Sequence, residues 1–153
     1  MEIVDPNWQA QLEMFVHVLI AVVLGGLVGM EREAVRRPAG VRTYAILSGA
    51  ACLLVVLTDV IISFFSSESV LSVMRTDPVR VVEAIITGTA FLGAGTIFRH
   101  GNNNVEGLTT AASMLLVASV GIAVALDQIY LAVMVTALTL ILLRVARKFL
   151  TQH

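Results

Sequence analysis

Long apolar stretches and short polar segments alternate along the whole chain. The apolar stretches are close to the roughly 20 residues that a helix needs to cross the hydrocarbon core of a membrane. The polar connections leave no room for a separate soluble domain. We therefore expect one all-α domain over residues 1–153, an integral membrane bundle of about five helices. The predicted membrane-spanning helices are residues 11–30, 43–65, 79–98, 108–126 and 129–147.

The composition agrees with a membrane protein. Hydrophobic residues make up 58% of the chain, charged residues only 14%, and the mean hydropathy is +0.90. A soluble domain is usually about one quarter charged. The net charge of −1 gives no reason to expect a nucleic acid as partner. Acidic residues precede the first stretch where a signal peptide would be basic, so we expect that stretch to be retained.

Lysine and arginine are distributed unevenly between the two sides of the predicted bundle. Arg75 and Arg80 lie on one side. The other eight lie in the first connection, the third connection and the C-terminal tail: Arg32, Arg36, Arg37, Arg42, Arg99, Arg144, Arg147 and Lys148. Because cytoplasmic segments carry the excess of positive charge, we predict an external N-terminus and a cytoplasmic C-terminus. Trp8 and Tyr130 then fall near the outer interface and Tyr44 near the inner one, where aromatic residues are enriched.

Few residues suggest catalysis or a bound metal ion. Cys52 is the only cysteine and can form no internal disulfide, and the three histidines are scattered along the chain. The sequence holds no recognisable nucleophile with its base, and no zinc or dinucleotide motif. We therefore expect a protein that is not an enzyme, and we assign no cofactor and no metal site.

Small residues four apart mark predicted contacts between helices, because close packing rather than the hydrophobic effect holds helices together in lipid. On the third helix we expect Gly88 to permit such packing. The same residues offer surfaces for self-association, so we expect a homo-oligomer, with a homodimer as the simplest form. These small-residue stripes are Ala21-Gly25-Gly29, Ala45-Gly49, Ala84-Gly88 and Gly121-Ala125.

The segment TGTAFLGAGTIFR, residues 87–99, places three glycines inside an apolar run. Gly93 and Gly95 are separated by one residue, so a single packing stripe cannot use both. The favoured interpretation is that helices pack on two sides of this segment. The alternative is a break in the helix whose carbonyls could coordinate a cation, since irregular backbone at membrane depth occurs only inside protein or along a wet cavity.

Polar residues converge on the predicted cytoplasmic end of the bundle. Glu31 and Arg42 flank the first connection at the same depth, and we expect them to form an ion pair. Further polar residues lie at neighbouring helix ends, namely Arg99, Glu106, Thr109 and Thr110. A structured polar cluster is one interpretation of these residues. The other is a role in orienting the protein, which we accept for Arg36 and Arg37.

Charged residues also begin the third predicted helix, at its outer end. Asp77 suits the N-cap and Pro78 the first turn. Arg80 and Glu83 are three residues apart, and we expect them to pair. Glu83 then lies one turn inside the membrane with Thr87 a turn deeper, and an intramembrane carboxylate is by default a functional candidate. Carboxylate and hydroxyl oxygens are ligands that Mg²⁺ prefers, although no spacing here is diagnostic.

Three blocks of the sequence resemble one known family. They are GGLVGMEREAVRRPAGVRTYAIL, DPVRVVEAIITGTAFLGAGTIFR and VEGLTTAASMLLVASVGIAVA. In this order they are similar to the MgtC/SapB family of bacterial membrane proteins. The resemblance implies about five transmembrane helices in the bacterial inner membrane and a role in growth at low magnesium. In virulence-type members the implied mechanism is binding and restraint of the F-type ATP synthase.

The resemblance also implies a set of functional positions. Those that match the motifs of the family are Glu31, Arg32, Gly40, Arg42, Thr43, Asp77, Arg80, Gly88, Phe91, Leu92, Gly93, Gly95, Gly107, Thr109, Thr110 and Ala111. The chain departs from the virulence-type pattern at Thr109, where those members have asparagine, and Ala90 replaces the glycine of the usual motif G-F-L-G-A-G. Those members also carry a soluble C-terminal domain, so the resemblance is to the membrane domain.

Two functions follow as expectations. The first is support of magnesium or envelope homeostasis by binding another membrane complex. The second is a magnesium or other cation channel or transporter that uses Glu83, Thr87 and the glycine segment as its path.

Overall fold

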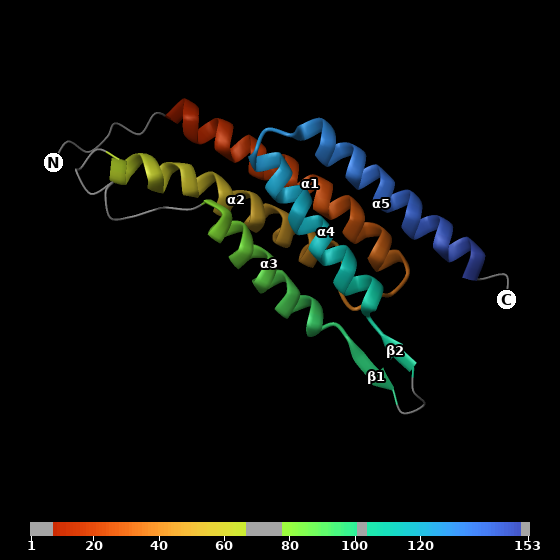
Figure 1. Cartoon of the computed structure of the whole chain (residues 1–153). Coiled ribbons are helices and arrows are strands. Elements are labelled where there is room, and N and C mark those ends of the chain that lie inside the picture. The colour runs from red at the N-terminus through yellow and green to blue at the C-terminus, as the bar shows by residue number, and fades with distance from the viewer. Residues whose placement is uncertain (1–7, 67–77, 101–103, 151–153) are drawn as a thin grey trace.

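The computed structural model describes residues 8–66, 78–100 and 104–150. These residues form five helices and one short hairpin (Figure 1). The elements are α1 (Trp8–Ala34), α2 (Val41–Ser66), α3 (Pro78–Ala94), β1 (Phe98–His100), β2 (Asn104–Glu106), α4 (Leu108–Ala125) and α5 (Ile129–Leu150). The predicted all-α bundle of five helices is confirmed.

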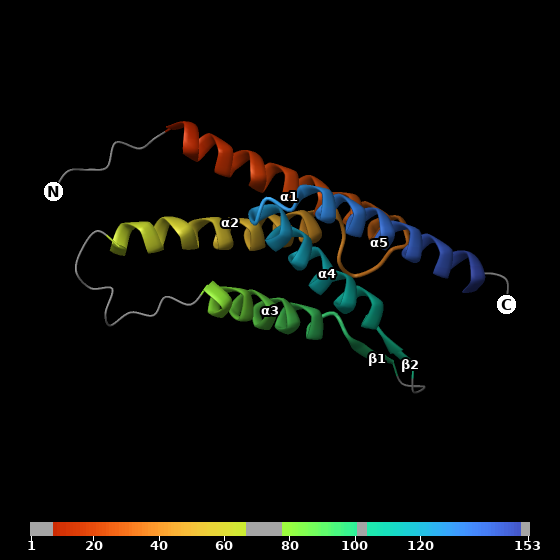
Figure 2. The same ribbon diagram turned by 45° about the horizontal axis from the view of Figure 1, so that its top comes forward.

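Successive helices run in opposite directions, and α2 lies between α1 and α3 (Figure 2). α4 packs against each of the other four helices and forms the centre of the bundle. At one end α1 finishes, α2 begins, the β1–β2 hairpin projects and α4 begins (Figure 1). We call this the hairpin end. It holds the connections that the charge distribution assigns to the cytoplasm, an orientation that stays a prediction.

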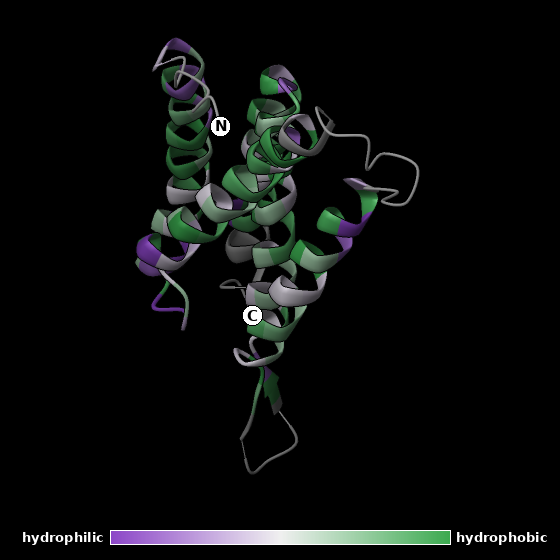
Figure 3. Ribbon diagram, turned by 90° about the vertical axis from the view of Figure 1, so that its left-hand side faces the viewer, coloured by the Kyte–Doolittle hydropathy of each residue, from purple (hydrophilic) through white to green (hydrophobic). Residues whose placement is uncertain are grey.

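The outer surfaces of the helices are apolar. α1, α2 over Val41–Ser63 and α4 are long and apolar enough to cross a membrane, and α5 over Ile129–Val145 is a shorter apolar helix. Large hydrophobic side chains such as Phe15, Ile46 and Phe91 are 62%, 69% and 80% exposed. Hydrophobic residues dominate most of the length of the helices (Figure 3). An apolar surface of this extent is unfavourable in water and suits lipid.

Glycines bring α1, α2 and α4 into close contact. A Cβ added at Gly25 would lie 2.5 Å from the carbonyl oxygen of Tyr44 and 2.6 Å from Cβ of Ser48. A Cβ added at Gly121 of α4 would overlap the carbonyl oxygen of Ser48. Packing by the stripes on α1 and α4 is thus confirmed, because only glycine allows backbones to approach this closely.

The prediction that Gly88 permits close helix packing is wrong. A Cβ added there would meet nothing within 4 Å, so the Ala84-Gly88 stripe faces open space instead of another helix. The small residues of α3 that do pack lie further along, where a Cβ at Gly93 would be 3.2 Å from Cβ of Ala111 on α4.

The third helix is shorter than predicted, ending at Ala94 and not at residue 98. Thr96 donates its N–H and its hydroxyl to the carbonyl of Gly93, at 2.9 and 2.7 Å, and Gly95 lies in the resulting turn. The favoured interpretation, packing on two sides of a continuous helix, is therefore wrong.

Gly107 follows the hairpin at φ 95, and a Cβ there would overlap the Thr96 carbonyl, so only glycine fits this close approach.

Two very short connections use the same hydrogen-bonded turn. After α1, the N–H groups of Arg36 and Arg37 donate to carbonyls of the last helical turn at 2.9 and 3.1 Å, with Arg36 at φ 53. After α4, Asp127 and Gln128 repeat the arrangement at 3.0 and 2.9 Å, with Asp127 at φ 61. This Schellman arrangement satisfies the last carbonyls of each helix while the chain reverses. His17 of α1, 3.4 Å from the Asp127 carboxylate, joins the second turn to α1.

Candidate functional site

A cluster of buried polar side chains lies at the hairpin end, between α1, α2 and α4. Each member is less than 9% exposed in a surrounding of apolar residues. We call this set the polar cluster; its members are Glu31, Arg32, Tyr44, Thr110 and Ser113. Buried polar groups are costly unless they are hydrogen-bonded, so their partners decide what the cluster can do.

Glu31 and Arg32 form a buried ion pair at the end of α1. Nε of Arg32 donates to Oε2 of Glu31 at 2.6 Å, and Nη2 lies 2.5 Å from the same oxygen. The pair neutralises two charges that burial would otherwise penalise. Oε1 of Glu31 is buried and accepts no hydrogen bond in the described structure. A buried carboxylate oxygen without a donor is a ready acceptor for a water, a cation or a donor group of a ligand.

Tyr44, Ser113 and Thr110 form a second, linked group. The Tyr44 hydroxyl is 2.6 Å from the Ser113 hydroxyl and 3.2 Å from the Thr110 carbonyl, to which Ser113 also donates at 2.9 Å. These bonds fix the first turn of α4 against the first turn of α2. The tyrosine ring packs in the core beside Val28 and Met114.

The loop between α1 and α2 is shaped by Glu33 and Gly40. Glu33 accepts the backbone N–H of Val41 at 2.9 Å, and so supplies the cap for the start of α2. A Cβ at Gly40 would lie 2.7 Å from that carboxylate oxygen. Close contact continues at Gly29, where a Cβ would be 3.0 Å from Cβ of Tyr44. The loop therefore holds α1 and α2 in the register that buries the polar cluster.

A hollow of about 390 Å³ opens beside the cluster. It is lined by Arg37, Val105, Glu106, Gly107, Leu108, Thr109 and Thr110. Gly107 gives α4 no side-chain cap, so donors of the first turn of α4 are left for other partners. With the Arg37 guanidinium and the Glu106 carboxylate, the hollow offers hydrogen-bond donors and an acceptor. Thr110 belongs to both the hollow and the cluster, and so joins them.

The structure confirms part of the predicted polar end. Glu31 and Arg32 form a buried ion pair there, Thr110 is buried at the start of α4, and Thr109 lines the adjoining hollow. The expected ion pair between Glu31 and Arg42 is wrong, because Glu31 pairs with its neighbour Arg32. Arg42 is exposed, as is Thr43.

The first turns of α3, predicted to lie at the outer side of the membrane, also differ from the expectation. Among the described residues, Arg80 and Glu83 form no ion pair within 4.0 Å, and both are exposed. Thr87 donates its hydroxyl to the carbonyl of Glu83 at 2.7 Å, within the same helix. The predicted N-cap at Asp77 lies outside the described residues, and so does the side chain of Arg99, whose backbone belongs to β1.

Sequence reasoning missed three residues of the site. Tyr44 was expected at the membrane interface but is fully buried. Ser113 stands three residues after Thr110, and this spacing on one helical face was a signal that could have found it. Arg37, assigned only a role in orientation, lines the hollow. No local sequence pattern reveals this position of Arg37, because the loop between α1 and α2 reaches α4 only through the packing of three helices.

The described part of the chain contains no group of three or more His, Cys, Asp or Glu side chains placed to hold a metal ion. What the site offers is one free buried carboxylate oxygen and an adjoining hollow with both donors and acceptors. Such an arrangement can recognise a polar group of a partner or a hydrated cation by hydrogen bonds.

The apolar outer surface, the three helices long enough to span and the polar cluster define a helical membrane protein. The chain belongs to the MgtC family, whose sequence model matches residues 18–152. No solved structure matches the chain.

Several curated proteins are similar to the chain. An uncharacterized protein of Haemophilus influenzae is 37% identical over 135 residues, which cover 88% of this chain and 56% of that protein. YhiD of Escherichia coli K12, whose name describes it as a candidate magnesium transporter, is 31% identical over 87% of this chain and 60% of its own length. The MgtC protein of Brucella abortus is 40% identical over 67% of this chain and 38% of its own length. The chain thus spans about 38–60% of these three relatives.

Proposed function

We propose that this protein is a multi-pass protein of the bacterial inner membrane that supports magnesium or envelope homeostasis when magnesium is scarce. It does so by binding another membrane protein complex through the hairpin end. Support for the magnesium context comes from membership of the MgtC family and from the name of the YhiD relative.

The observation that carries the binding role is the contrast between the interior of the bundle and its hairpin end. The interior between α1, α2 and α4 is closed by backbone contacts, as at Gly25 and Gly121. The hairpin end instead presents a hollow lined by Arg37, Glu106 and Thr109. The polar cluster at the same end holds a buried carboxylate oxygen, Oε1 of Glu31, that has no hydrogen-bond partner among the described residues. A site of this kind on an end of the molecule favours recognition of a partner over passage of an ion through one bundle.

The alternative is a cation channel or transporter. It is favoured by the intramembrane carboxylate of Glu83, which is exposed on the surface of α3 with Thr87 one turn away. Because these residues face outward, a path that uses them would have to lie between two copies of the chain.

Growth at low magnesium tests the binding role. A strain that lacks the protein is complemented with the wild type, with Arg37→Gln or with Arg144→Gln. Arg37 lines the hollow, whereas Arg144 is exposed on α5 and serves as the matched control. We expect Arg37→Gln to lose growth while Arg144→Gln retains it, with both variants folded. Equal growth of the two variants would contradict a role for the hollow.

Magnesium flux separates the two functions. The purified protein is sealed in liposomes with an entrapped magnesium dye, beside Glu83→Ala and protein-free vesicles. The binding proposal expects the wild type to match the protein-free vesicles. Flux that Glu83→Ala abolishes would overturn the proposal and establish transport.

A photoreactive side chain at Val105, in the hollow, then tests for the partner, with Val133 on α5 as the control position. We expect a specific membrane protein to crosslink at Val105 and not at Val133, and the crosslink to be lost in Arg37→Gln. Equal crosslinking at both positions would contradict the proposal that the partner binds at the hairpin end.

A further inference from the structure

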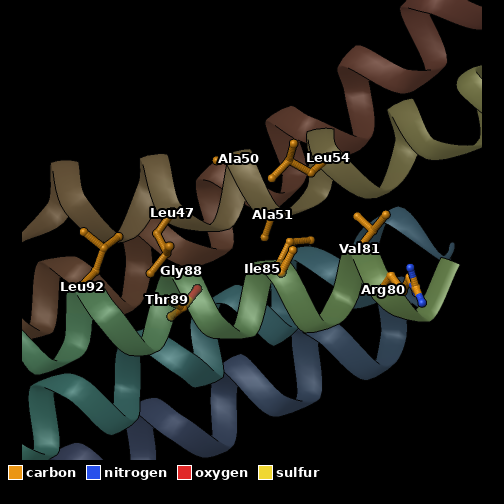
Figure 4. Close-up of a pocket in the computed structure, with 11 residues that line it drawn as sticks. Leu47, Ala50, Ala51, Leu54, Arg80, Val81, Ile85, Gly88, Thr89 and Leu92 are labelled. Atoms are coloured by element: carbon orange, nitrogen blue, oxygen red, sulfur yellow. The ribbon is translucent and has the colours of Figure 1, made fainter. Parts of the chain in front are cut away.

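An apolar groove of about 440 Å³ runs between α2 and α3 along most of the length of α3 (Figure 4). Its walls come from Leu47 and Leu54 on α2 and from Val81 and Leu92 on α3. Gly88 forms part of it and has nothing within 4 Å of an added Cβ. The volume is in the range of ligand-binding pockets, roughly 300–1,000 Å³.

In a membrane this groove cannot stay empty, because a void forfeits the dispersion contacts that its lining would otherwise make. The shape favours a thin apolar occupant. On α3 the lining extends from Arg80 to Leu92, about 18 Å at 1.5 Å per residue. One leaflet of the hydrocarbon core is about 15 Å deep. The groove therefore matches one acyl chain that extends along a single leaflet.

The charge at one end of the groove indicates which head group the acyl chain carries. Arg80 lies at the end opposite Leu92, in the first turn of α3 (Figure 4). No acidic group among the described residues lies within 4.0 Å of it. The positive end of the α3 dipole adds to the preference for an anion at this place. A phosphate at the head of an acyl chain satisfies both features.

We propose that the groove between α2 and α3 binds a phospholipid, with an acyl chain along Gly88 and the phosphate at Arg80. The exposed carboxylate of Glu83, three residues from Arg80, offsets the positive charge at the rim. The site therefore prefers a zwitterionic head group over one with surplus negative charge. A second copy of the chain suits the groove less well, because a helix about 10 Å across and 18 Å long occupies on the order of 1,400 Å³.

Native mass spectrometry of the full chain, extracted from bacterial membranes in mild detergent, tests the proposal. The wild type should retain one phospholipid, enriched in phosphatidylethanolamine over phosphatidylglycerol. Gly88→Leu fills the groove and should abolish retention. Ala90→Leu places the same leucine side chain at an exposed position of α3 outside the groove and should leave retention unchanged.

The phosphate contact is tested by titration of the delipidated protein with phosphatidylethanolamine. Arg80→Gln should bind about tenfold more weakly, as expected for the loss of a charge-assisted hydrogen bond. Arg144→Gln, on exposed α5, should bind like the wild type. If Gly88→Leu does not fold, Ala50→Leu narrows the same groove from α2 and takes its place.

Three outcomes would overturn the proposal. One is lipid retention by Gly88→Leu equal to that of the wild type, and another is an equal loss in Ala90→Leu. The third is a protein dimer without bound lipid that Gly88→Leu dissociates, because that would make the occupant a second copy. None of these results bears on growth at low magnesium or on Arg37, so the proposed function is tested separately.

Discussion

Replacement of Gly25 by alanine tests whether α1 and α2 meet as closely as the structure shows. The added Cβ would lie 2.5 Å from the Tyr44 carbonyl oxygen, about 0.9 Å short of the 3.4 Å at which ordinary contact begins. A carbonyl in a helix cannot rotate away, so the helices must separate. Overpacking of this kind costs about 1–3 kcal/mol.

The adjacent glycine is the matched control. A Cβ at Gly26 would have its nearest neighbour at 3.8 Å, Cβ of Ala45, which is an ordinary contact. Both substitutions gain the same helix propensity, roughly 1 kcal/mol for glycine to alanine. The difference between Gly25→Ala and Gly26→Ala therefore isolates the packing cost. We expect Gly25→Ala to be less stable than Gly26→Ala by about 1–3 kcal/mol.

The assay is equilibrium unfolding in mixed micelles with increasing sodium dodecyl sulfate, followed by far-UV circular dichroism. At equal slopes, the shift of the midpoint gives the difference in free energy of unfolding. Equal midpoints for the two variants would refute the close approach of α1 and α2. Because Tyr44 belongs to the polar cluster, Gly25→Ala should also impair growth at low magnesium, whereas Gly26→Ala should not.

Three further substitutions test other parts of the structure. Tyr44→Phe removes the hydroxyl bound to Ser113 and should lower the free energy of unfolding by about 1 kcal/mol in the same assay; an unchanged value would contradict the hydrogen bonds. Gly107→Ala combines a left-handed φ with overlap of the Thr96 carbonyl and should cost more than about 2 kcal/mol, measured as loss of thermal stability; wild-type stability would contradict the hairpin geometry. Arg36→Gly relieves the left-handed φ of 53 and should stabilise by up to about 1 kcal/mol, so a marked destabilisation would argue against the turn after α1.

The helices were predictable because their signals are local. Apolar length, polar breaks and short connections placed all five, and α4 and α5 begin at the predicted residues. The end of α3 was not predictable from hydropathy, because residues 95–98 are as apolar as a helix end in lipid requires. What ends the helix is the turn at Gly95, held by Thr96, and the return of the chain beside it at Gly107.

The sequence predicted at which end of the bundle the candidate site lies, but not which of its side chains pair with one another. The polar residues at helix ends indicated one end of the bundle, and Glu31 and Thr110 are both buried there. The partner of Glu31 was missed because it depends on side-chain direction at the last turn of α1, where Arg32 folds back onto its neighbour. Tyr44 was misplaced because an amphipathic ring suits either an interface or a hydrogen-bonded core position.

The sequence by itself determined that this protein is a bundle of apolar helices, and which end of that bundle gathers its polar side chains. Both properties depend on composition and on spacing along one chain segment. The tertiary structure decided which glycines pack and which do not: Gly25 and Gly121 touch backbone of α2, whereas Gly88 faces an open groove. In lipid a small residue promotes contact only where a second backbone comes within reach, and that depends on how the helices are placed against one another.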